Sequence, residues 1–126
     1  MGKISPSTRY SGNRVSPSGH QPVHKQLLPD GEITTLSPIV SLMVRDHSPD
    51  GFQWGYSGSG PAQLALALLL NVTGDPETSQ EFYQAFKESV VASWGDTWSV
   101  TSEWIEYWIK TQSAIRLQGK VDARRN

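Results

Sequence analysis

The sequence contains no cysteine among its 126 residues. This absence excludes a disulfide framework, a zinc site built on thiolates and a cysteine nucleophile. Long apolar runs are absent too, because even the run that ends at Leu70 is far shorter than the roughly 18 residues of a membrane-spanning helix. The first residues, MGKISPSTRYSGNR, contain no apolar core of a secretory signal. We therefore expect a soluble cytoplasmic protein without a membrane partner.

Charges of opposite sign are unevenly distributed along the chain. Residues 26–115 carry eleven of the twelve acidic residues but only three of the eleven basic ones, an excess of eight negative charges. Such a body repels phosphate backbones, so we expect no nucleic-acid partner. The basic ends could contact nucleic acid or a membrane weakly. Solvated, disordered tails explain them more simply.

Composition divides the chain into three parts. Residues 1–25 are rich in Ser, Pro and Gly and hold few large apolar side chains, so we predict a largely disordered or irregular segment with Tyr10 as its anchor. Residues 26–116 form one globular domain, and residues 117–126 form a loose tail.

Two short strands are predicted at the start of this domain. Pro29, Asp30 and Gly31 form a turn, after which residues 32–36 contain Ile33 and two β-branched threonines. In residues 39–45, apolar and other side chains alternate, which predicts a second half-buried strand. Together they predict a small antiparallel sheet.

Three helices are predicted after residue 60. The first, from Pro61 to about Val72, is apolar nearly all round and should be the buried centre of the domain. The second begins at Asp75-Pro76, where a cap precedes a proline, and runs to about residue 93. A loop that could include a short extended piece separates it from the third, which starts after Thr101 and frays past residue 115. The fold class is α+β, with a small N-terminal antiparallel β-sheet packed on about three helices, of which the first is central.

The glycine-rich stretch WGYSGSG leads directly into the predicted central helix. Unpaired N–H groups at a helix start attract anions, and glycines let a ligand approach the backbone. However, the stretch is neither a Walker loop nor a dinucleotide fingerprint, and Pro61 removes one donor. We favour a structural interpretation in which Gln63 bonds back to the loop and closes it over the helix start.

Catalytic and metal-binding patterns are weak. The chain has three histidines, none with the spacing of a helical metal site. Ser57, His47 and Asp50 could be combined into a triad on paper, but no nucleophile-elbow motif supports it. We therefore expect no catalytic residue, no metal and no cofactor, and we expect His47 to brace the loop.

Five tryptophans are many for this length. Trp104 and Trp108 have the spacing of a buried helix face. Trp54 and Trp98 lie in predicted loops, so they are the better candidates for a partner-binding surface. The alternation of Phe52, Trp54 and Tyr56 would place three aromatic rings on one side of an extended segment.

Three quoted stretches carry a family resemblance: HSPDGFQWGYSGSGPAQLALALLL, EFYQAFK and WSVTSEWIEYWI. They are similar to the signature of domain of unknown function 6166, a family of bacterial, archaeal and phage proteins, and the similarity spans roughly Leu36 to Ile109. The family opens with a tyrosine-glycine strand and a hairpin. Here Tyr10-Ser11-Gly12 precedes a Pro/Ser-rich insertion, which makes that first strand uncertain. The resemblance implies no known activity, but it implies a small protein often carried by phages and plasmids.

Two functions follow from these patterns. The first is a non-enzymatic interaction protein, encoded on a mobile element and acting on a host protein. The alternative is a small-ligand or anion binder, or an enzyme, that uses the glycine-rich loop. The candidate ligand or interaction residues are His47, Ser48, Trp54, Tyr56, Ser57, Ser59, Gln63, Lys87 and Trp98.

Overall fold

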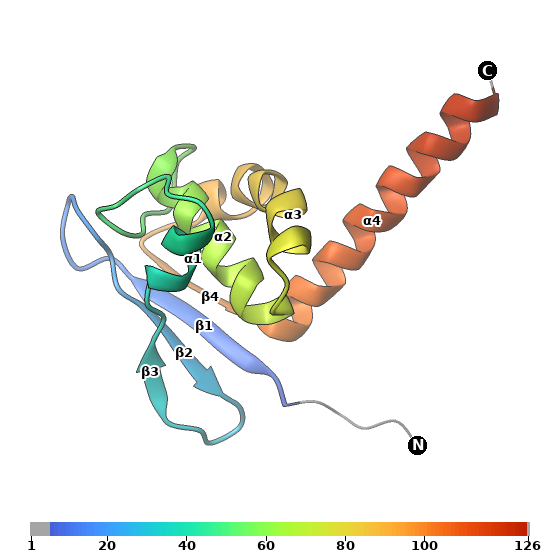
Figure 1. Cartoon of the computed structure of the whole chain (residues 1–126). Helices are drawn as coiled ribbons and strands as arrows, with labels where there is room; N and C mark the ends of the chain where they lie inside the picture. Colours follow the sequence, from blue (N-terminus) through green and yellow to red (C-terminus); the bar gives the residue numbers. More distant parts are fainter. Residues whose placement is uncertain (1–5, 126) are drawn as a thin grey trace.

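The computed structural model describes residues 6–125 and shows an antiparallel sheet beside a group of helices (Figure 1). The sheet has four strands in the order β3-β2-β1-β4. Their bounds are β1 Thr8–Asn13, β2 Val23–Leu27, β3 Ile33–Thr35 and β4 Thr97–Thr101. The helices are α1 Ile39–Val44, α2 Ser59–Thr73, α3 Pro76–Ser89, the short 3₁₀ helix η1 Val91–Ser93 and α4 Ser102–Arg125. The predicted α+β class is confirmed.

Helix α2 lies at the centre, as its composition predicts. All residues from Gly60 to Leu70 are buried, because the helix contacts α1, α3 and α4 and has almost no polar face. Gly74 ends the helix in the left-handed conformation, with φ of 66°. Asp75 then caps α3 by accepting a hydrogen bond from the backbone N–H of Glu77. These signals fix two helices within one continuous stretch of sequence.

The N-terminal segment differs from the prediction. Its described part is not disordered: β1 is a central strand, paired with β2 on one side and with β4 on the other. Tyr10 is buried and its hydroxyl donates a 2.6 Å hydrogen bond to Asn71 of α2, while burial raises the pKa of Tyr10 to about 12. Backbone pairing on both edges and a few buried side chains order a segment whose average composition is polar. Residues 1–5 lie outside the described part.

Residues 39–44 form helix α1, so the predicted strand there is wrong. Pro38 has helical backbone angles, and the hydroxyl of Ser41 donates a 2.7 Å hydrogen bond to the carbonyl of Pro38. The polar Ser41 is buried, whereas the apolar Val40 is exposed. The alternation of residue types therefore does not mark a buried strand face. The predicted strand at residues 32–36 is confirmed as β3.

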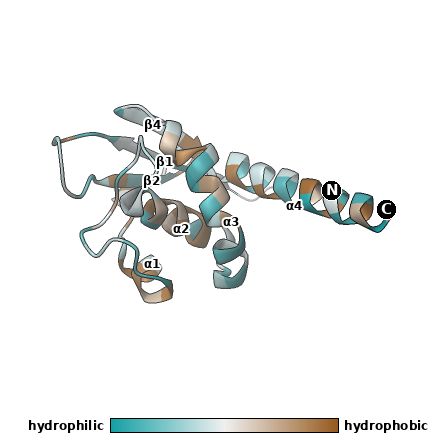
Figure 2. Ribbon diagram, turned by 90° about the horizontal axis from the view of Figure 1, so that it is seen from above, coloured by the Kyte–Doolittle hydropathy of each residue, from teal (hydrophilic) through white to brown (hydrophobic). Residues whose placement is uncertain are grey.

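The C-terminal helix is longer than predicted. Helix α4 continues to Arg125, so residues 117–125 are helical and not a loose tail. Its second half extends away from the rest of the molecule (Figures 1 and 2). Every side chain described from residue 117 onward is exposed. Within residues 6–125, no helix combines the length and the apolar character needed to cross a membrane.

Candidate functional site

The loop between α1 and α2 carries most of the candidate residues. Phe52 and Trp54 are completely buried, and the Trp54 indole N–H donates a 2.9 Å hydrogen bond to the carbonyl of Gly95. Trp54 therefore belongs to the core and does not lie on an exposed surface, in contrast to the expectation from its place in a predicted loop. Tyr56 is half exposed and does not join the other two rings. The alternation predicts the side-chain directions only as far as the backbone stays extended.

Glycines in this loop allow close packing. Gly51 has φ of 105°, and a Cβ there would lie 2.2 Å from Nδ1 of His20. Gly60 lies on the first turn of α2, where a Cβ would approach Gln53 to 2.6 Å. Larger residues would push the loop off the helix. The glycines thus have a structural explanation that needs no bound ligand.

Gln63 uses its whole side-chain amide inside the protein. Its Oε1 accepts hydrogen bonds from the backbone N–H groups of His47 and Ser48, at 2.7 and 3.1 Å. Its Nε2 donates to Ser41 Oγ and to the carbonyl of Arg45, at 2.9 and 3.1 Å. All of its donor and acceptor groups therefore serve to attach the end of α1 and the start of the loop to α2. Gln63 bonds back to the loop, as the sequence interpretation requires.

His47 braces the loop against α3. Its Nε2 lies 2.5 Å from the hydroxyl of Tyr83, and the two rings are 5.3 Å apart. Partial burial lowers the pKa of His47 below its usual value, and the positive charges of Arg45 and Lys87 lower the pKa further. The neutral imidazole is favoured in this position, as expected for a bracing histidine.

Ser57 and Lys87 meet at a third residue, Glu88. The Ser57 hydroxyl donates a 2.7 Å hydrogen bond to Glu88, and Lys87 Nζ lies 2.9 Å from the same carboxylate oxygen. The hydrogen bond from Ser57, and then the contact with Lys87, hold the pKa of Glu88 below its usual range. Ser57 thus bonds to the Glu88 carboxylate and His47 to the Tyr83 hydroxyl. The catalytic triad of Ser57, His47 and Asp50 considered from the sequence is therefore not assembled.

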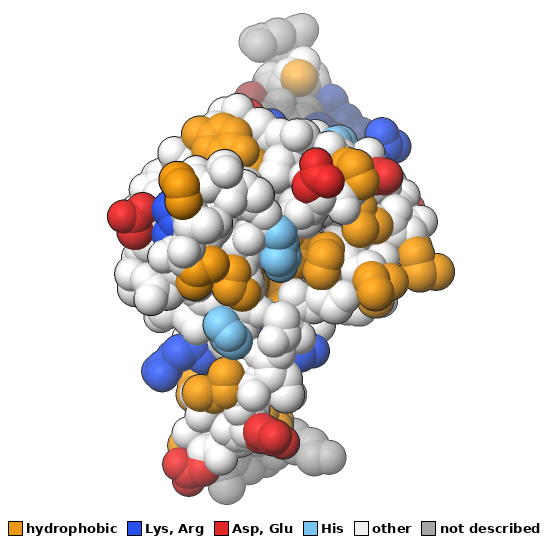
Figure 3. All heavy atoms as spheres, turned by 90° about the vertical axis from the view of Figure 1, so that its left-hand side faces the viewer, with side chains coloured by type: hydrophobic (Ala, Val, Ile, Leu, Met, Phe, Trp, Pro, Cys, Tyr) orange, Lys and Arg blue, Asp and Glu red, His pale blue; other side chains and the backbone are white. Residues whose placement is uncertain are grey.

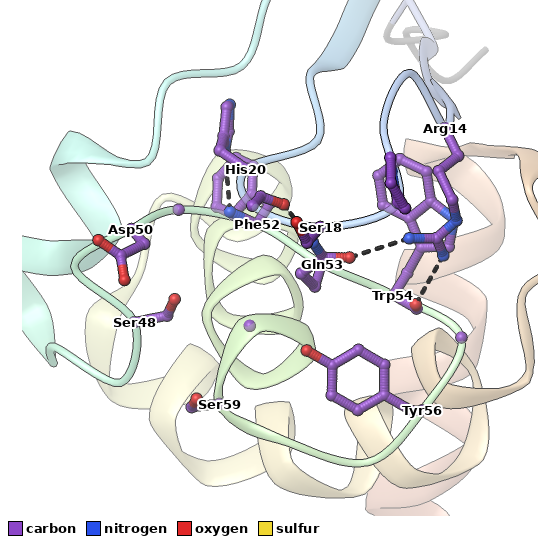
Figure 4. Close-up of a pocket in the computed structure, with 15 residues that line it drawn as sticks. Arg14, Ser18, His20, Ser48, Asp50, Phe52, Gln53, Trp54, Tyr56 and Ser59 are labelled. Carbon is purple, nitrogen blue, oxygen red and sulfur yellow. Dashed lines mark hydrogen bonds between the residues drawn. The ribbon is translucent and has the colours of Figure 1, made fainter.

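A cavity of about 540 Å³ lies between this loop and the β1–β2 connection (Figure 4). The α1–α2 loop and the start of α2 contribute the polar side chains of three candidates, Ser48, Tyr56 and Ser59, and the carboxylate of Asp50. The β1–β2 connection contributes Arg14 and His20, which sequence analysis missed because it treated residues 1–25 as disordered. Lys87 does not line this cavity.

Arg14 is held by three hydrogen bonds at the edge of the cavity. Its guanidinium bonds to Asp96, to Oε1 of Gln53 and to the carbonyl of Trp54, each at 3.0 Å. It also lies over the Trp54 ring, 5.2 Å from the centroid. Because most of its donors are engaged, Arg14 joins the hairpin loop, the glycine-rich loop and the segment before β4. His20 has a similar role, since its Nδ1 accepts a hydrogen bond from the backbone N–H of Phe52.

Trp98 is also a core residue, and it does not lie on an exposed surface. It stacks on Trp94 with centroids 3.9 Å apart and meets Trp54 edge-on at 5.5 Å. Gly12 makes this cluster possible, because a Cβ there would lie 2.5 Å from the Trp98 ring nitrogen. The tryptophan predicted to lie in a loop is therefore on the inner face of β4.

Exposed apolar side chains gather instead on α1. Ile39, Val40 and Met43 are 63%, 63% and 82% exposed. Beside them is a groove of about 340 Å³ between α1, β3 and the end of α2, lined by residues that include Leu36, Val40, Val44, Ala67, Leu70 and Pro76. Figure 3 shows several hydrophobic patches on the side of the molecule where α1 and β3 lie. We call Ile39, Val40 and Met43 the α1 patch.

Metal binding finds no support in the geometry. In residues 6–125, the His, Asp and Glu side chains form no group of three or more that could hold an ion. Several candidate side chains, those of His47, Ser57, Gln63 and Lys87, form hydrogen bonds or ion pairs within the fold. The region is a braced loop with a polar cavity on one side and an apolar patch on α1.

The fold and this region define a small α+β domain in which a glycine-rich loop is fixed by a glutamine to a central apolar helix. The chain belongs to the family of unknown function DUF6166, because the sequence model of that family matches residues 10–111. The match begins inside β1, so it also covers the hairpin that the quoted stretches leave out. No curated protein and no solved structure matches the chain.

Proposed function

We propose that this protein acts by binding another protein through the α1 patch, without catalysing a reaction. The observation that carries the proposal is the exposure of Ile39, Val40 and Met43 on one short helix beside an apolar groove. Contiguous exposed apolar side chains on a small protein are typical of interaction surfaces. Methionine suits such a surface because its flexible thioether adapts to different partners.

The position of α1 also supports binding. Its buried Ser41 and the carbonyl of Arg45 just after it both accept hydrogen bonds from Gln63. The helix is therefore fixed to α2 before any partner arrives, which lowers the entropy cost of association. Gln63 thus prepares the surface without contacting the partner.

The chemistry of the groove defines the kind of partner. An apolar side chain of the partner would enter the groove beside Val40 and Val44, while the ammonium group of Lys25, which also lines the groove, would donate to an acidic group of the partner. We further propose that the partner is a host protein of a phage or plasmid. That part rests on the family resemblance alone.

The test compares a double variant of the α1 patch with a control variant elsewhere on the surface. Val40→Asp combined with Met43→Asp places charges on the α1 patch, while Val15→Asp places one on an exposed apolar residue elsewhere, which is 65% exposed. We expect affinity capture from a host lysate, followed by binding measurements with the purified partner, to show loss of binding for the double variant only. Equal binding by all three proteins would contradict the proposal.

A second candidate function is binding of a small polar ligand in the cavity beside the loop. The supporting observation is the cavity itself, with the side chains of Ser48, Asp50, Tyr56 and Ser59 on its wall. The acidic Asp50 and the engaged guanidinium of Arg14 make a neutral or hydroxylated ligand more suitable than an anion. Polyols and nucleosides should then raise the melting temperature, and Asp50→Asn together with Tyr56→Ala should remove that rise. A rise with sulfate or phosphate instead would favour the anion.

A further inference from the structure

The outward face of α4 carries a regular apolar pattern. Tyr107, Ala114 and Val121 follow one another at intervals of seven residues, and Leu117 lies between the last two. Tyr107, Leu117 and Val121 are 67%, 64% and 37% exposed. Intervals of seven with an intermediate residue are the pattern of a helix-pairing seam. We call these four residues the α4 seam.

The opposite face of α4 holds the helix to the protein. Ile105 and Trp108 are buried, and the Trp108 ring contacts Phe86 at 4.9 Å. Further along, Arg116 lies over the Phe82 ring and bonds to Glu81 of α3. The exposed α4 seam therefore lies on the face of the helix opposite these contacts. The second half of α4 extends beyond the body of the molecule (Figure 2).

Charges on α4 are arranged along its length. The first turns contain Glu103 and Glu106, and the last turns contain Lys120 and Arg124 with one acidic residue, Asp122, between them. Glu106 and Lys120 each come one residue before a seam position, so they flank the seam on the same side. A parallel pair of such helices would bring like charges together, whereas an antiparallel pair would bring acidic turns beside basic ones.

We propose that two copies of this protein pair through α4 in antiparallel orientation. The α4 seams contact each other, and Glu106 of each copy lies beside Lys120 of the partner subunit. The two bodies do not collide, because each lies on the face of its own α4 that is turned away from the seam. This self-association is independent of the α1 patch.

The seam is short, so the dimer is weak and reversible. Alanine gives it little area, and Lys110 occupies a position where a long coiled coil would have an apolar residue. We expect sedimentation equilibrium of the full chain to show a monomer–dimer equilibrium in the micromolar range or weaker. Raised salt should favour the monomer.

Charge reversal tests both the pairing and its direction. Glu106→Lys and Lys120→Glu each place two like-charged pairs in the antiparallel dimer, so each variant alone should dimerise roughly tenfold more weakly. An equimolar mixture of the two variants restores opposite charges at both places and should form heterodimers as readily as the natural chain. Both residues are exposed, so we expect the fold to be preserved, and circular dichroism of each variant checks this.

Each outcome of this experiment decides the proposal. Loss with each variant and recovery on mixing support antiparallel pairing, and Leu117→Glu should abolish dimerisation. A chain that stays monomeric at all concentrations overturns the proposal. A dimer that persists in all of these variants overturns it too, because the contact then lies elsewhere. A mixture that fails to recover overturns the antiparallel direction.

Discussion

At the scale of single residues, the glycine-rich loop depends on groups that look polar and exposed in the sequence but are internal in the fold. Gln63 is completely buried and bonds to four different residues. Arg14 and His20, which lie in the β1–β2 connection, form hydrogen bonds with the backbone of the same loop. A loop held by buried hydrogen bonds keeps one shape, since breaking any of them leaves a desolvated group without a partner.

Gln63→Ala should therefore lower the free energy of unfolding by about 1–3 kcal/mol, the cost of leaving buried polar groups unpaired. Lys87→Ala should cost less, because its partner Glu88 is 58% exposed and is therefore not left buried without a partner. Denaturant titration of both variants provides the measurement. If sulfate stabilises the natural chain and both variants lose that effect, the loop binds an anion and the structural interpretation fails.

The histidine in this loop makes stability depend on pH. The pKa of His47 is lowered in the folded chain from its usual value of 6.5, so the unfolded chain takes up a proton first as the pH falls. The contribution of His47 is complete above pH 6.5 and is lost as the pH drops toward the folded pKa. His47→Gln should flatten the melting temperature between about pH 7 and pH 5. A folded-state pKa above 6.5 in an NMR titration would contradict this.

At the scale of elements, α2 is the helix on which the others pack. It contacts α1, α3, α4 and η1, and its leucines are buried on every side. Such a helix cannot shift to fill a hole on one face without losing contacts on another. Deletions of side-chain volume in α2 should therefore be costly.

Leu66→Ala should cost about 2–5 kcal/mol of unfolding free energy, as expected for a completely buried leucine. Leu117→Ala is the matched control, because the same change is made on an exposed part of α4. At concentrations where the chain is monomeric, the control should cost little. Chemical denaturation checks both, and a loss below about 1 kcal/mol for Leu66→Ala would contradict the central position of α2.

At the scale of the whole molecule, the sheet joins the N-terminal segment to the strand that precedes α4. Arg9 of β1 pairs with Gln26 of β2 and with Thr101 of β4. The backbone N–H of Thr8 also bonds to the hydroxyl of Ser102, where α4 begins. The N-terminal segment is therefore part of the fold, whereas the last turns of α4 are not packed on it.

Truncations test the contribution of each end of the chain to stability. Removal of residues 118–126 should leave the melting temperature nearly unchanged, because no described side chain there is buried. Removal of residues 1–13 should prevent folding, since it deletes the strand between β2 and β4. Thermal unfolding followed by circular dichroism measures both. A stable fold without residues 1–13 would show that β1 is dispensable.

Local signals explain which parts of the fold are predictable. Asp75 and Pro76 act within a single turn, and the apolar run of α2 reports burial directly, so both helices follow from the sequence. Strand β1 does not follow from the sequence in this way. Its Gly12 has no side chain that would indicate burial, and its role is to leave space for the rings of Trp98 and Trp54. Its place in the sheet depends on β4, far away in the sequence.

The candidate site also contains some contacts that the sequence predicts and others that it does not. The bond from Gln63 to the loop spans 15 or 16 residues and follows from a polar side chain on an apolar helix. The contacts of Arg14 span 39 or more residues, and no local pattern indicates them. The exposure of α1 is likewise not predictable from the sequence, because apolar residues usually face the core.

The pairing of β1 with β4 has a consequence for synthesis on the ribosome. Strand β1 leaves the exit tunnel early, but one of its edges meets its partner only after residues 97–101 have emerged. Until then the nascent chain exposes an unpaired strand edge, which can pair with other chains. The contact between residues 9 and 101 also closes a long loop, so we expect completion of the sheet to be the slow, late step of folding.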